Sequence, residues 1–408
     1  MNIELHPHPL NGIISVPTSK SLAHRAIICA SLSKGTSHIY DISMSKDIEA
    51  TITSMQNLGA DIHMDGSTCI ITGIQSWNSC VCDCNESGST LRFLIPIAAT
   101  QCIDCSFVGK SSLFSRPMSV YADLFAQQNL QFQQESSGIH IQGGLQADTF
   151  EVPGNISSQF ISGILMACPL LHKDSLLKVQ PPFESQSYVD LTLFMLKKFG
   201  IHIQKVDTYT FFIPGNQSYS CCDYTVEGDY SQMAFFAVLG VIRHSISVSN
   251  MNLDSLQGDK KILDWIPYQK ENDQLVFKKH ALVAQDFDIA DCPDLGPILC
   301  VLAAYSKGTS HLLHTKRLRY KECDRIAAME MELKKWGVVI SSDEDSITIH
   351  GKESYCMDSV VEMDSHNDHR IAMACTVFSL CANSASVLKG CEAIQKSYPN
   401  FFNHIDSL

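Results

Sequence analysis

The sequence lacks the features that mark membrane-spanning, secreted, nucleic-acid-binding and nucleotide-binding proteins. No apolar run reaches about 18 residues, the length that a transmembrane helix needs. The first residues carry no basic segment followed by an apolar one, so we expect no signal peptide and a cytoplasmic protein. The net charge of −13 argues against nucleic-acid binding, which normally needs a basic face. The glycine-rich signature of nucleoside triphosphate-binding loops is also missing.

Cysteine, by contrast, is abundant. The 17 cysteines are scattered through apolar runs, where a cytoplasmic protein keeps them reduced as small buried side chains. Cys80, Cys82 and Cys84, with the pair Cys102 and Cys105, have the close spacing of metal ligands. No second set of paired ligands follows them, so buried thiols and a zinc site are both open interpretations, and we predict no metal.

Length and composition describe a globular protein with more than one domain. A chain of 408 residues is too long for one ordinary hydrophobic core. Its 45% of hydrophobic and 18% of charged residues are typical of globular chains.

A repeated string indicates that the two halves are related. Residues 33–39 read SKGTSHI and residues 306–312 read SKGTSHL. Both strings follow an apolar helix and precede a strand, a polar loop, a helix, a glycine and a further strand. We predict a βαβαββ-type unit that is used several times in each half, with a boundary near residue 225.

A helix predicted from residue 20 onward has cations in its first two turns. Thr18 or Ser19 can cap it, and Lys20, Ser21 and Arg25 follow. Hydroxyls, free backbone N–H groups and cations at one helix start suit a phosphate or a carboxylate. A surface helix with ordinary capping is the alternative.

Residues 316–325 (KRLRYKECDR) form a second charged helix start. Lys321 and Arg325 are four residues apart, so we expect them to share a helix face with Glu322 beside them. A cationic pair next to a carboxylate suits an anionic ligand and a proton transfer. A solvated, salt-bridged helix start is the other interpretation.

Similar polar segments open further predicted helices. Asp294 precedes an apolar helix, where it is either a cap or a general base. The segment 85–92 (NESGSTLR) either cradles an anion or is a plain capping loop. Cations recur at these helix starts although they oppose the helix dipole there, which favours convergence on a polyanionic ligand. The cations are Lys20, Arg25, Arg92, Lys321, Arg325 and Arg370.

The order of these motifs resembles that of the EPSP synthase family, the 3-phosphoshikimate 1-carboxyvinyltransferases, over essentially the whole chain. The resemblance rests on residues 17–21 (PTSKS), 87–92 (SGSTLR), 157–160 (SSQF), 293–294 (PD), 318–325 (LRYKECDR) and 367–370 (NDHR).

The resemblance implies an α/β fold of two inside-out α/β barrel domains, each of three βαβαββ-type repeats, with the active site in the interdomain cleft. One domain would comprise residues 1–14 and 226–408, and the other residues 15–225. The substrates would be phosphoenolpyruvate and shikimate 3-phosphate, and the enolpyruvyl group would pass to the 5-hydroxyl by addition and elimination through a tetrahedral intermediate. We expect a monomer with no metal or organic cofactor and no nucleic-acid or membrane partner.

The resemblance also implies roles for individual residues. The catalytic residues would be Asp294, Lys20, Glu322 and His369, with Asp294 accepting the proton of the shikimate hydroxyl. The substrate-binding residues would be Lys20, Ser21, Arg25, Gly88, Arg116, Ser157, Ser158, Gln159, Ser185, Asp294, Lys321, Arg325, Arg370 and Lys396.

Three positions depart from the familiar bacterial pattern. Glu86 and Arg317 stand where that pattern has Asn, and Phe93 replaces a Pro. A carboxylate at Glu86 would repel phosphoenolpyruvate unless it points away or pairs with a cation.

The sequence leaves two alternatives to an EPSP synthase. The related transferase that acts on UDP-N-acetylglucosamine carries a catalytic Cys on the loop before its Ala-Arg-Pro, whereas residues 109–117 contain none. A non-catalytic anion-binding protein on the same scaffold would not need all the charged residues that the resemblance assigns.

Overall fold

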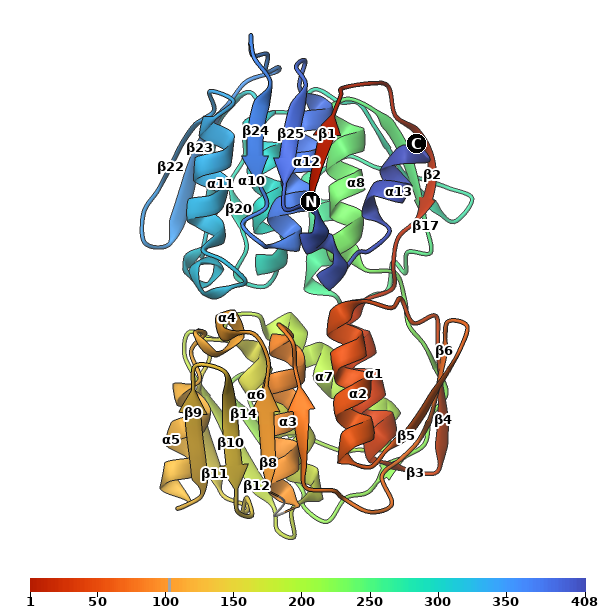
Figure 1. Cartoon of the computed structure of the whole chain (residues 1–408), viewed down its shortest axis with the longest axis vertical. Helices are drawn as coiled ribbons and strands as arrows, with labels where there is room; N and C mark the ends of the chain where they lie inside the picture. The colour runs from red at the N-terminus through yellow and green to blue at the C-terminus, as the bar shows by residue number, and fades with distance from the viewer. Residues whose placement is uncertain (102–103) are drawn as a thin grey trace. The chain divides into compact units, whose positions relative to one another are not determined.

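The computed structural model describes residues 1–101 and 104–408 as a mixed α/β protein (Figure 1). Its contacts divide the chain into two compact units. Unit 1 consists of Met1–Pro17 and Glu227–Leu408, and unit 2 consists of Thr18–Val226.

The N-terminal segment joins unit 1 through two strands. β1 (Asn2–Leu5) pairs antiparallel with β25 (Ser386–Lys389), so the red strand β1 and the blue strand β25 lie side by side in Figure 1. β2 (Asn11–Ser15) pairs parallel with β17 (Ser245–Ser249). The first two strands of the chain therefore belong to sheets whose other strands come from the C-terminal half.

The described residues of unit 2 form three four-stranded sheets and one small two-stranded sheet. The four-stranded orders are β16-β4-β6-β5, β7-β8-β10-β9 and β11-β12-β14-β13. Its strands are β3 (Ser33–Lys34), β4 (Thr36–Tyr40), β5 (Asp61–Asp65), β6 (Thr68–Thr72), β7 (Cys80–Asp83), β8 (Cys105–Val108), β9 (Gln131–Glu135), β10 (Gly138–Gln142), β11 (Thr149–Pro153), β12 (Ser175–Gln180), β13 (Gln204–Lys205), β14 (Thr210–Ile213), β15 (Tyr219–Ser220) and β16 (Tyr224–Thr225). Its helices are α1 (Lys20–Leu32), α2 (Lys46–Leu58), α3 (Gly88–Thr100), α4 (Ser111–Phe114), α5 (Ser119–Gln127), α6 (Ser158–Ala167), the 3-10 helix η1 (Cys168–Leu170) and α7 (Gln186–Lys198).

Unit 1 contains two four-stranded sheets and one three-stranded sheet, in the orders β18-β19-β17-β2, β20-β21-β23-β22 and β1-β25-β24. Its remaining strands are β18 (Gln269–Glu271), β19 (Gln274–Lys278), β20 (Phe287–Asp288), β21 (Gly308–Leu313), β22 (Val339–Ser342), β23 (Ser346–Gly351) and β24 (Val361–Asp364). Its helices are α8 (Tyr230–Ile242), η2 (Gly258–Lys261), α9 (Ile262–Trp265), η3 (Pro293–Leu295), α10 (Gly296–Ala304), η4 (Lys316–Tyr320), α11 (Arg325–Lys334), α12 (His369–Cys381), η5 (Cys391–Lys396) and α13 (Phe401–Asp406).

The same order of elements recurs in both units. In unit 2, β11, α6, β12, α7, β13 and β14 follow one another, and the first two strands pair in parallel. In unit 1, β20, α10, β21, α11, β22 and β23 follow one another with the same parallel pair. In each case the last two strands form a hairpin that pairs antiparallel with the second strand.

The two SKGTSH strings occupy equivalent turns. Gly35 has a φ of 112° just before β4, and Gly308 has a φ of 119° at the start of β21. Residues with a side chain avoid this backbone region, so both turns favour glycine. The repeat seen in the sequence is thus a repeat of backbone geometry.

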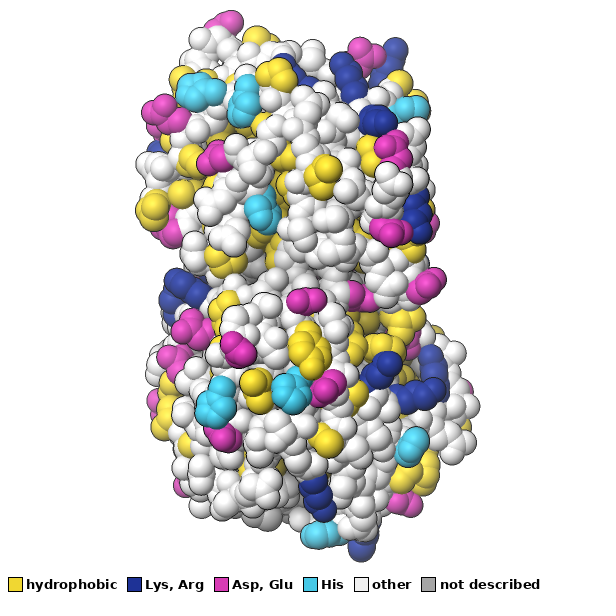
Figure 2. All heavy atoms as spheres, turned by 90° about the vertical axis from the view of Figure 1, so that its right-hand side faces the viewer, with side chains coloured by type: hydrophobic (Ala, Val, Ile, Leu, Met, Phe, Trp, Pro, Cys, Tyr) yellow, Lys and Arg dark blue, Asp and Glu magenta, His cyan; other side chains and the backbone are white. Residues whose placement is uncertain are grey.

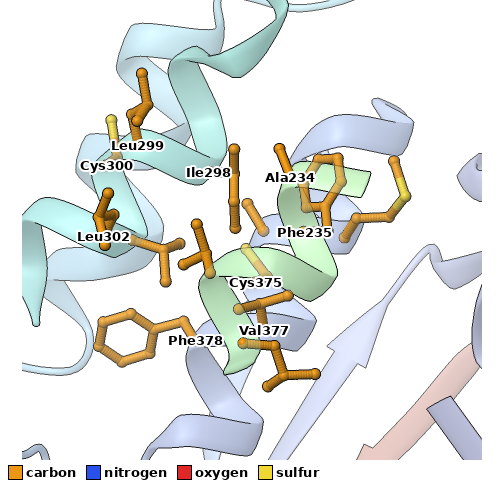
Figure 3. Close-up of a cluster of buried hydrophobic side chains, with 14 of the residues drawn as sticks. Ala234, Phe235, Ile298, Leu299, Cys300, Leu302, Cys375, Val377 and Phe378 are labelled. Atoms are coloured by element: carbon orange, nitrogen blue, oxygen red, sulfur yellow. The ribbon is translucent and has the colours of Figure 1, made fainter. Parts of the chain in front are cut away.

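Buried helices make up a large part of the core of unit 1. In unit 1, α8, α10 and α12 are buried on nearly every side, which explains why their sequences are apolar all round. Figure 3 shows side chains of the three helices, including Phe235, Ile298 and Phe378, meeting in this core. None of the described helices has the length and apolar character needed to cross a membrane.

The surface view in Figure 2 shows charged side chains of both signs intermingled on the face that it displays. Hydrophobic side chains on that face occur in small separate groups. This face therefore shows neither a continuous basic surface nor a broad apolar one.

Candidate active site

In unit 1, Asp294 lies at the centre of a group of cations. It belongs to the short helix η3, which leads directly into the buried helix α10. Its carboxylate oxygens lie 3.3 Å from Nζ of Lys321, 3.1 Å from the guanidinium of Arg325 and 2.9 Å from that of Arg370. One partly exposed carboxylate thus serves as counter-ion to three cations.

Lys321 and Arg325 reach Asp294 from different local structures. The expectation that they share a helix face is wrong, because α11 begins at Arg325 and Lys321 has an extended backbone after η4. The side chain of Asp324 accepts a hydrogen bond from the backbone N–H of Ala327 at 3.0 Å and so caps α11. This cap fixes where the helix begins, and the tertiary fold brings the two cations together.

Arg325 is surrounded by carboxylates. Besides Asp294, its guanidinium lies 2.7 Å from Glu322 and 2.7 Å from Asp368, and the side chain is 1% exposed. Burial by itself lowers the pKa of Arg325, but Asp368, Glu322 and Asp294 reverse this effect and raise the pKa well above its usual value. Arg325 is therefore a permanent cation.

Asp368 was not among the predicted site residues. It is fully buried, and its carboxylate accepts a hydrogen bond from the backbone N–H of Arg370 at 2.8 Å, which caps α12. A signal was present, because an Asp just before an apolar helix is a typical N-cap. Its second contact, with Arg325, is 43 residues distant in sequence and could not be inferred.

The other predicted residues of unit 1 lie around the start of α12. His369 is the first residue of this helix and is buried. Arg370 donates to Oγ of Ser231, at the start of α8, at 3.0 Å. Lys396, at the end of η5, donates to the backbone carbonyl of Asn367. All seven predicted residues of this unit are therefore connected to the starts of α10, α11 and α12.

The environment of Lys321 differs from that of Arg325. Burial lowers the pKa of Lys321, and the nearby Asp294 carboxylate opposes this shift only in part. The ammonium group consequently gives up its proton more readily than an exposed lysine does.

In unit 2, Arg25 connects three helices. From α1 it donates to Oγ1 of Thr192 at 2.8 Å and to the backbone carbonyl of Tyr188 at 2.9 Å, both on α7. It also donates to Oγ of Ser162, on α6, at 3.4 Å. Among the described residues every acceptor of Arg25 is neutral, and burial lowers the pKa of its guanidinium to about 10.

A second group in unit 2 surrounds Gly88. A Cβ atom added at Gly88 would lie 3.1 Å from the guanidinium of Arg116. It would also lie 3.3 Å from the guanidinium of Arg92 and 3.3 Å from Oε1 of Gln159. Arg92 donates to this amide oxygen at 2.8 Å. The absence of a side chain at residue 88 thus gives room to two arginines and a glutamine at the start of α3.

The start of α6 carries the remaining neutral donors. Ser157 caps the helix by accepting from the backbone N–H of Gln159 at 3.3 Å, and Ser158 is the first helical residue. The side-chain amide of Gln159 donates to Oγ of Ser89 at 3.0 Å, which ties α6 to α3.

Lys20 opens α1, and Ser19 is its cap. Nζ of Lys20 lies 2.7 Å from the carboxylate of Asp47 on α2, a partner that the sequence did not reveal. Ser21 follows Lys20, and its backbone carbonyl accepts from Arg25 at 2.8 Å. Ser185 is buried at the N-cap position of α7, with a φ of 54°.

A buried chain of hydrogen bonds joins the helices that carry these residues. Nδ1 of His24 lies 2.7 Å from Oγ1 of Thr51, which lies 2.6 Å from Oγ1 of Thr90. Thr90 in turn donates to Oγ of Ser87, the cap of α3, at 2.7 Å. Because all four residues are fully buried, this chain fixes α1, α2 and α3 relative to one another.

The three departures from the bacterial pattern have a structural account. Glu86 is buried, and its carboxylate lies 3.1 Å from Nζ of Lys110, so it pairs with a cation. Arg317 is also buried, and its guanidinium donates to the backbone carbonyl of Ala290. Phe93 packs in the core, where the guanidinium of Arg25 lies 5.1 Å from the centre of its ring.

The cysteines singled out in the sequence separate into two sets. Cys80, Cys82 and Cys105 come together, whereas Cys84 is buried outside this group. Cys102 lies outside the described residues. The described cysteines form no disulfide.

Comparisons with known proteins agree over the full chain. Residues 5–405 match the family model of EPSP synthase (3-phosphoshikimate 1-carboxyvinyltransferase). A 3-phosphoshikimate 1-carboxyvinyltransferase of Clostridium novyi is 41% identical over 425 residues, covering 100% of this chain and 97% of that one. The enzyme of the same name from Clostridium perfringens strain ATCC 13124 is also 41% identical, over 98% of this chain and 97% of its own.

Solved structures share the fold. An EPSP synthase from Acinetobacter baumannii has a TM-score of 0.79 at 24% identity, covering 100% of this chain and 97% of its own. The enolpyruvyl transferase NikO from Streptomyces tendae has a TM-score of 0.80 at 14% identity, covering 99% and 96%.

Together, the mixed α/β fold and these matches define the chain as a transferase. It belongs to the EPSP synthase family. The matches do not favour the alternative in which UDP-N-acetylglucosamine is the acceptor.

Proposed function

We propose that the two groups of residues described above, one in each unit, carry out the reaction of the EPSP synthase family. As a member of this family, the chain transfers the enolpyruvyl group of phosphoenolpyruvate to shikimate 3-phosphate, a step in aromatic biosynthesis. The products are 5-enolpyruvylshikimate 3-phosphate and inorganic phosphate.

The proposed mechanism has an addition and an elimination. In the addition, Asp294 accepts the proton of the 5-hydroxyl group while the oxygen of that hydroxyl attacks C2 of phosphoenolpyruvate. C3 gains a proton in the same step. In the elimination, the C–O bond to phosphate breaks and C3 loses a proton, which restores the double bond. Glu322, His369 and Lys20 are the candidates for the proton transfers at C3 and at the leaving phosphate.

The observation that carries this proposal is the position of Asp294 among Lys321, Arg325 and Arg370. In this proposal the carboxylate of Asp294 is the proton acceptor, and its oxygen atoms lie within salt-bridge distance of all three cations. When phosphoenolpyruvate binds, its phosphate and carboxylate compete for the same cations. We expect the substrate to take over some of these contacts, so that Asp294 can accept the hydroxyl proton.

In unit 2, we propose that the residues around Arg25 and at the neighbouring helix starts bind shikimate 3-phosphate. Arg25 is a buried cation with neutral acceptors, and a phosphate would supply the missing opposite charge. The helix starts add hydroxyl, amide and backbone N–H donors. The proposed shikimate 3-phosphate ligands are Lys20, Ser21, Arg25, Ser157, Ser158, Gln159 and Ser185.

Phosphoenolpyruvate is the proposed ligand of the other predicted substrate-binding residues. Gly88 and Arg116 of unit 2 would contact it, and Lys321, Arg325, Arg370 and Lys396 of unit 1 would neutralise its charges. Several fixed cations suit a reaction in which charge moves to a leaving phosphate, because their orientation is set before the reaction begins.

The proposal extends to architecture and setting. The mostly buried helices α1, α3 and α6 of unit 2 and α8, α10 and α12 of unit 1 support inside-out α/β barrels of three repeats each. We also propose a monomeric, cytoplasmic enzyme that uses no metal or organic cofactor in the reaction.

The direct test is release of inorganic phosphate from phosphoenolpyruvate in the presence of shikimate 3-phosphate. Phosphate should appear only when both substrates are present, and UDP-N-acetylglucosamine should not replace shikimate 3-phosphate. The Lys321→Met variant should remain folded by circular dichroism and should release none. Folded wild-type protein without phosphate release would refute the function, and an active Lys321→Met variant would remove Lys321 from the site.

A further inference from the structure

Two neighbouring strands of unit 2 bring three thiols to one face of a sheet. β7 is the edge strand of the order β7-β8-β10-β9 and runs parallel to β8. In this register Cys80 lies opposite Cys105. Cys82 is two residues beyond Cys80, so its side chain points to the same face.

The spacing of the sulfur atoms suits a shared metal ion. Sγ of Cys82 lies 3.7 Å from Sγ of Cys80 and 3.9 Å from Sγ of Cys105, and all three lie within 4.8 Å of one another. Tetrahedral zinc with bonds of about 2.3 Å holds its sulfur ligands about 3.8 Å apart. A disulfide would require a separation of about 2.05 Å, so the present spacing fits an ion between the sulfurs better than a bond.

The surroundings provide both cover and access. Helix α2 packs against β7, and Sγ of Cys82 lies 3.9 Å from the backbone carbonyl of Ser54 on that helix. Cys82 and Cys105 are buried, whereas Cys80 is partly exposed at the sheet edge. An ion can therefore enter beside Cys80, where a water molecule can complete its coordination.

We propose that Cys80, Cys82 and Cys105 together bind one zinc ion. On binding, the three thiols release three protons and become thiolate ligands, with no change in oxidation state. The ion would have a structural role and take no part in the proposed reaction, because it would hold the edge strand β7 against β8. Because β7 leads into the loop that carries Ser87 and Gly88, the ion would also stabilise the start of α3.

Metal content and cobalt binding test this proposal on the full-length protein. Protein purified under reducing conditions without a chelator should contain about one zinc ion per chain. After removal of the metal, added Co²⁺ should give the absorption bands of a thiolate-bound tetrahedral ion. The Cys82→Ser variant should lose at least roughly tenfold in affinity for the ion.

The matched control is Cys69→Ser, which changes a buried cysteine of the same unit that lies outside the cluster. It should bind cobalt like the wild type. If Cys82→Ser does not fold, Cys80→Ser at the partly exposed position replaces it. Folded, reduced protein without cobalt–thiolate bands, equal binding by wild type and the cluster variants, or a disulfide within the cluster would each overturn the proposal.

Discussion

Two buried arginines, one in each unit, have opposite electrostatic environments. Arg25 is 2% exposed and bonds to hydroxyl and carbonyl oxygens, and its pKa falls to about 10. Arg325 is 1% exposed and contacts three carboxylates, and its pKa is raised well above the usual value. Unit 2 thus leaves a cation that an external anion would stabilise, whereas unit 1 supplies the anions itself.

The difference teaches how the two units could divide their work. A site whose charge is unbalanced until ligand arrives favours tight binding of a dianionic phosphate. A site whose cations already contact a carboxylate holds the proposed base in a fixed position before substrate binds. We therefore expect substitutions in unit 1 to affect turnover and folding, and substitutions in unit 2 to affect mainly substrate affinity.

The largest effect is expected from Asp294→Asn. The amide keeps the shape of the side chain but cannot accept the hydroxyl proton, so kcat should fall by about 10³-fold. The measurement is phosphate release at saturating concentrations of both substrates. Asp291→Asn, an exposed neighbour, is the control and should retain wild-type kcat. A loss of less than about tenfold in Asp294→Asn would show that another group is the base.

The comparison of the two arginines can be tested directly with one substitution at both places. Arg325→Met leaves the buried Asp368 and the neighbouring Glu322 without their cation, so we expect unit 1 to lose about 3–5 kcal/mol of stability. Arg25→Met removes a buried charge whose partners among the described residues are neutral, so unit 2 should change by no more than about 1 kcal/mol. Calorimetric unfolding of the substrate-free proteins measures both.

The same two variants separate binding from stability. Arg25→Met should raise KM for shikimate 3-phosphate even though its folding is nearly unchanged. Equal destabilisation by the two substitutions, or an unchanged KM in Arg25→Met, would contradict the contrast between the units.

A smaller effect is expected in the pH dependence of kcat/KM. Lys321 contacts substrate as a cation in the proposed mechanism, and burial lowers its pKa below the usual 10.5. The charged form is present below the pKa and is lost above it, so kcat/KM should begin to fall below pH 10.5. Lys321→Arg keeps its charge to higher pH and should move this alkaline limb upward. An unmoved limb would assign it to another group.

The smallest effect is expected from Gly88→Ala. The new methyl group would lie 3.1 Å from the Arg116 guanidinium, which must then shift by a few tenths of an ångström. We expect a roughly tenfold or smaller rise in KM for phosphoenolpyruvate and little change in kcat. Steady-state kinetics with each substrate varied in turn provides the measurement. A change in KM for shikimate 3-phosphate alone would place Gly88 beside the other substrate.

Local features of the sequence were sufficient to predict several helix starts. Ser19 and Ser157 lie at N-caps as their residue types favour, and the buried helices are apolar on all sides. The local prediction was wrong for Lys321, because a run of helix-forming residues on both sides of Asp324 conceals the cap that begins α11. Propensity cannot decide between continuing a helix and starting a new one when both are locally acceptable.

Partners that are distant in the chain could not be predicted from spacing. Arg325 lies 31 residues from Asp294 and 43 from Asp368, and Lys20 meets Asp47 from another helix. The three-thiol cluster shows the same limit, since the parallel register of β7 and β8 sets Cys105 opposite Cys80. Close spacing along the chain had also indicated Cys84 as a possible metal ligand, but Cys84 does not belong to the cluster in the structure.

The sequence by itself determined the family, the repeated unit and the kinds of side chain at each helix start, because these depend on residue order and short-range physics. The tertiary structure alone decided which charges are neighbours. In the folded protein Arg325 is surrounded by carboxylates, whereas Arg25 contacts neutral oxygen atoms. Electrostatic energy depends on distance and burial, and the order of residues alone does not determine either of them.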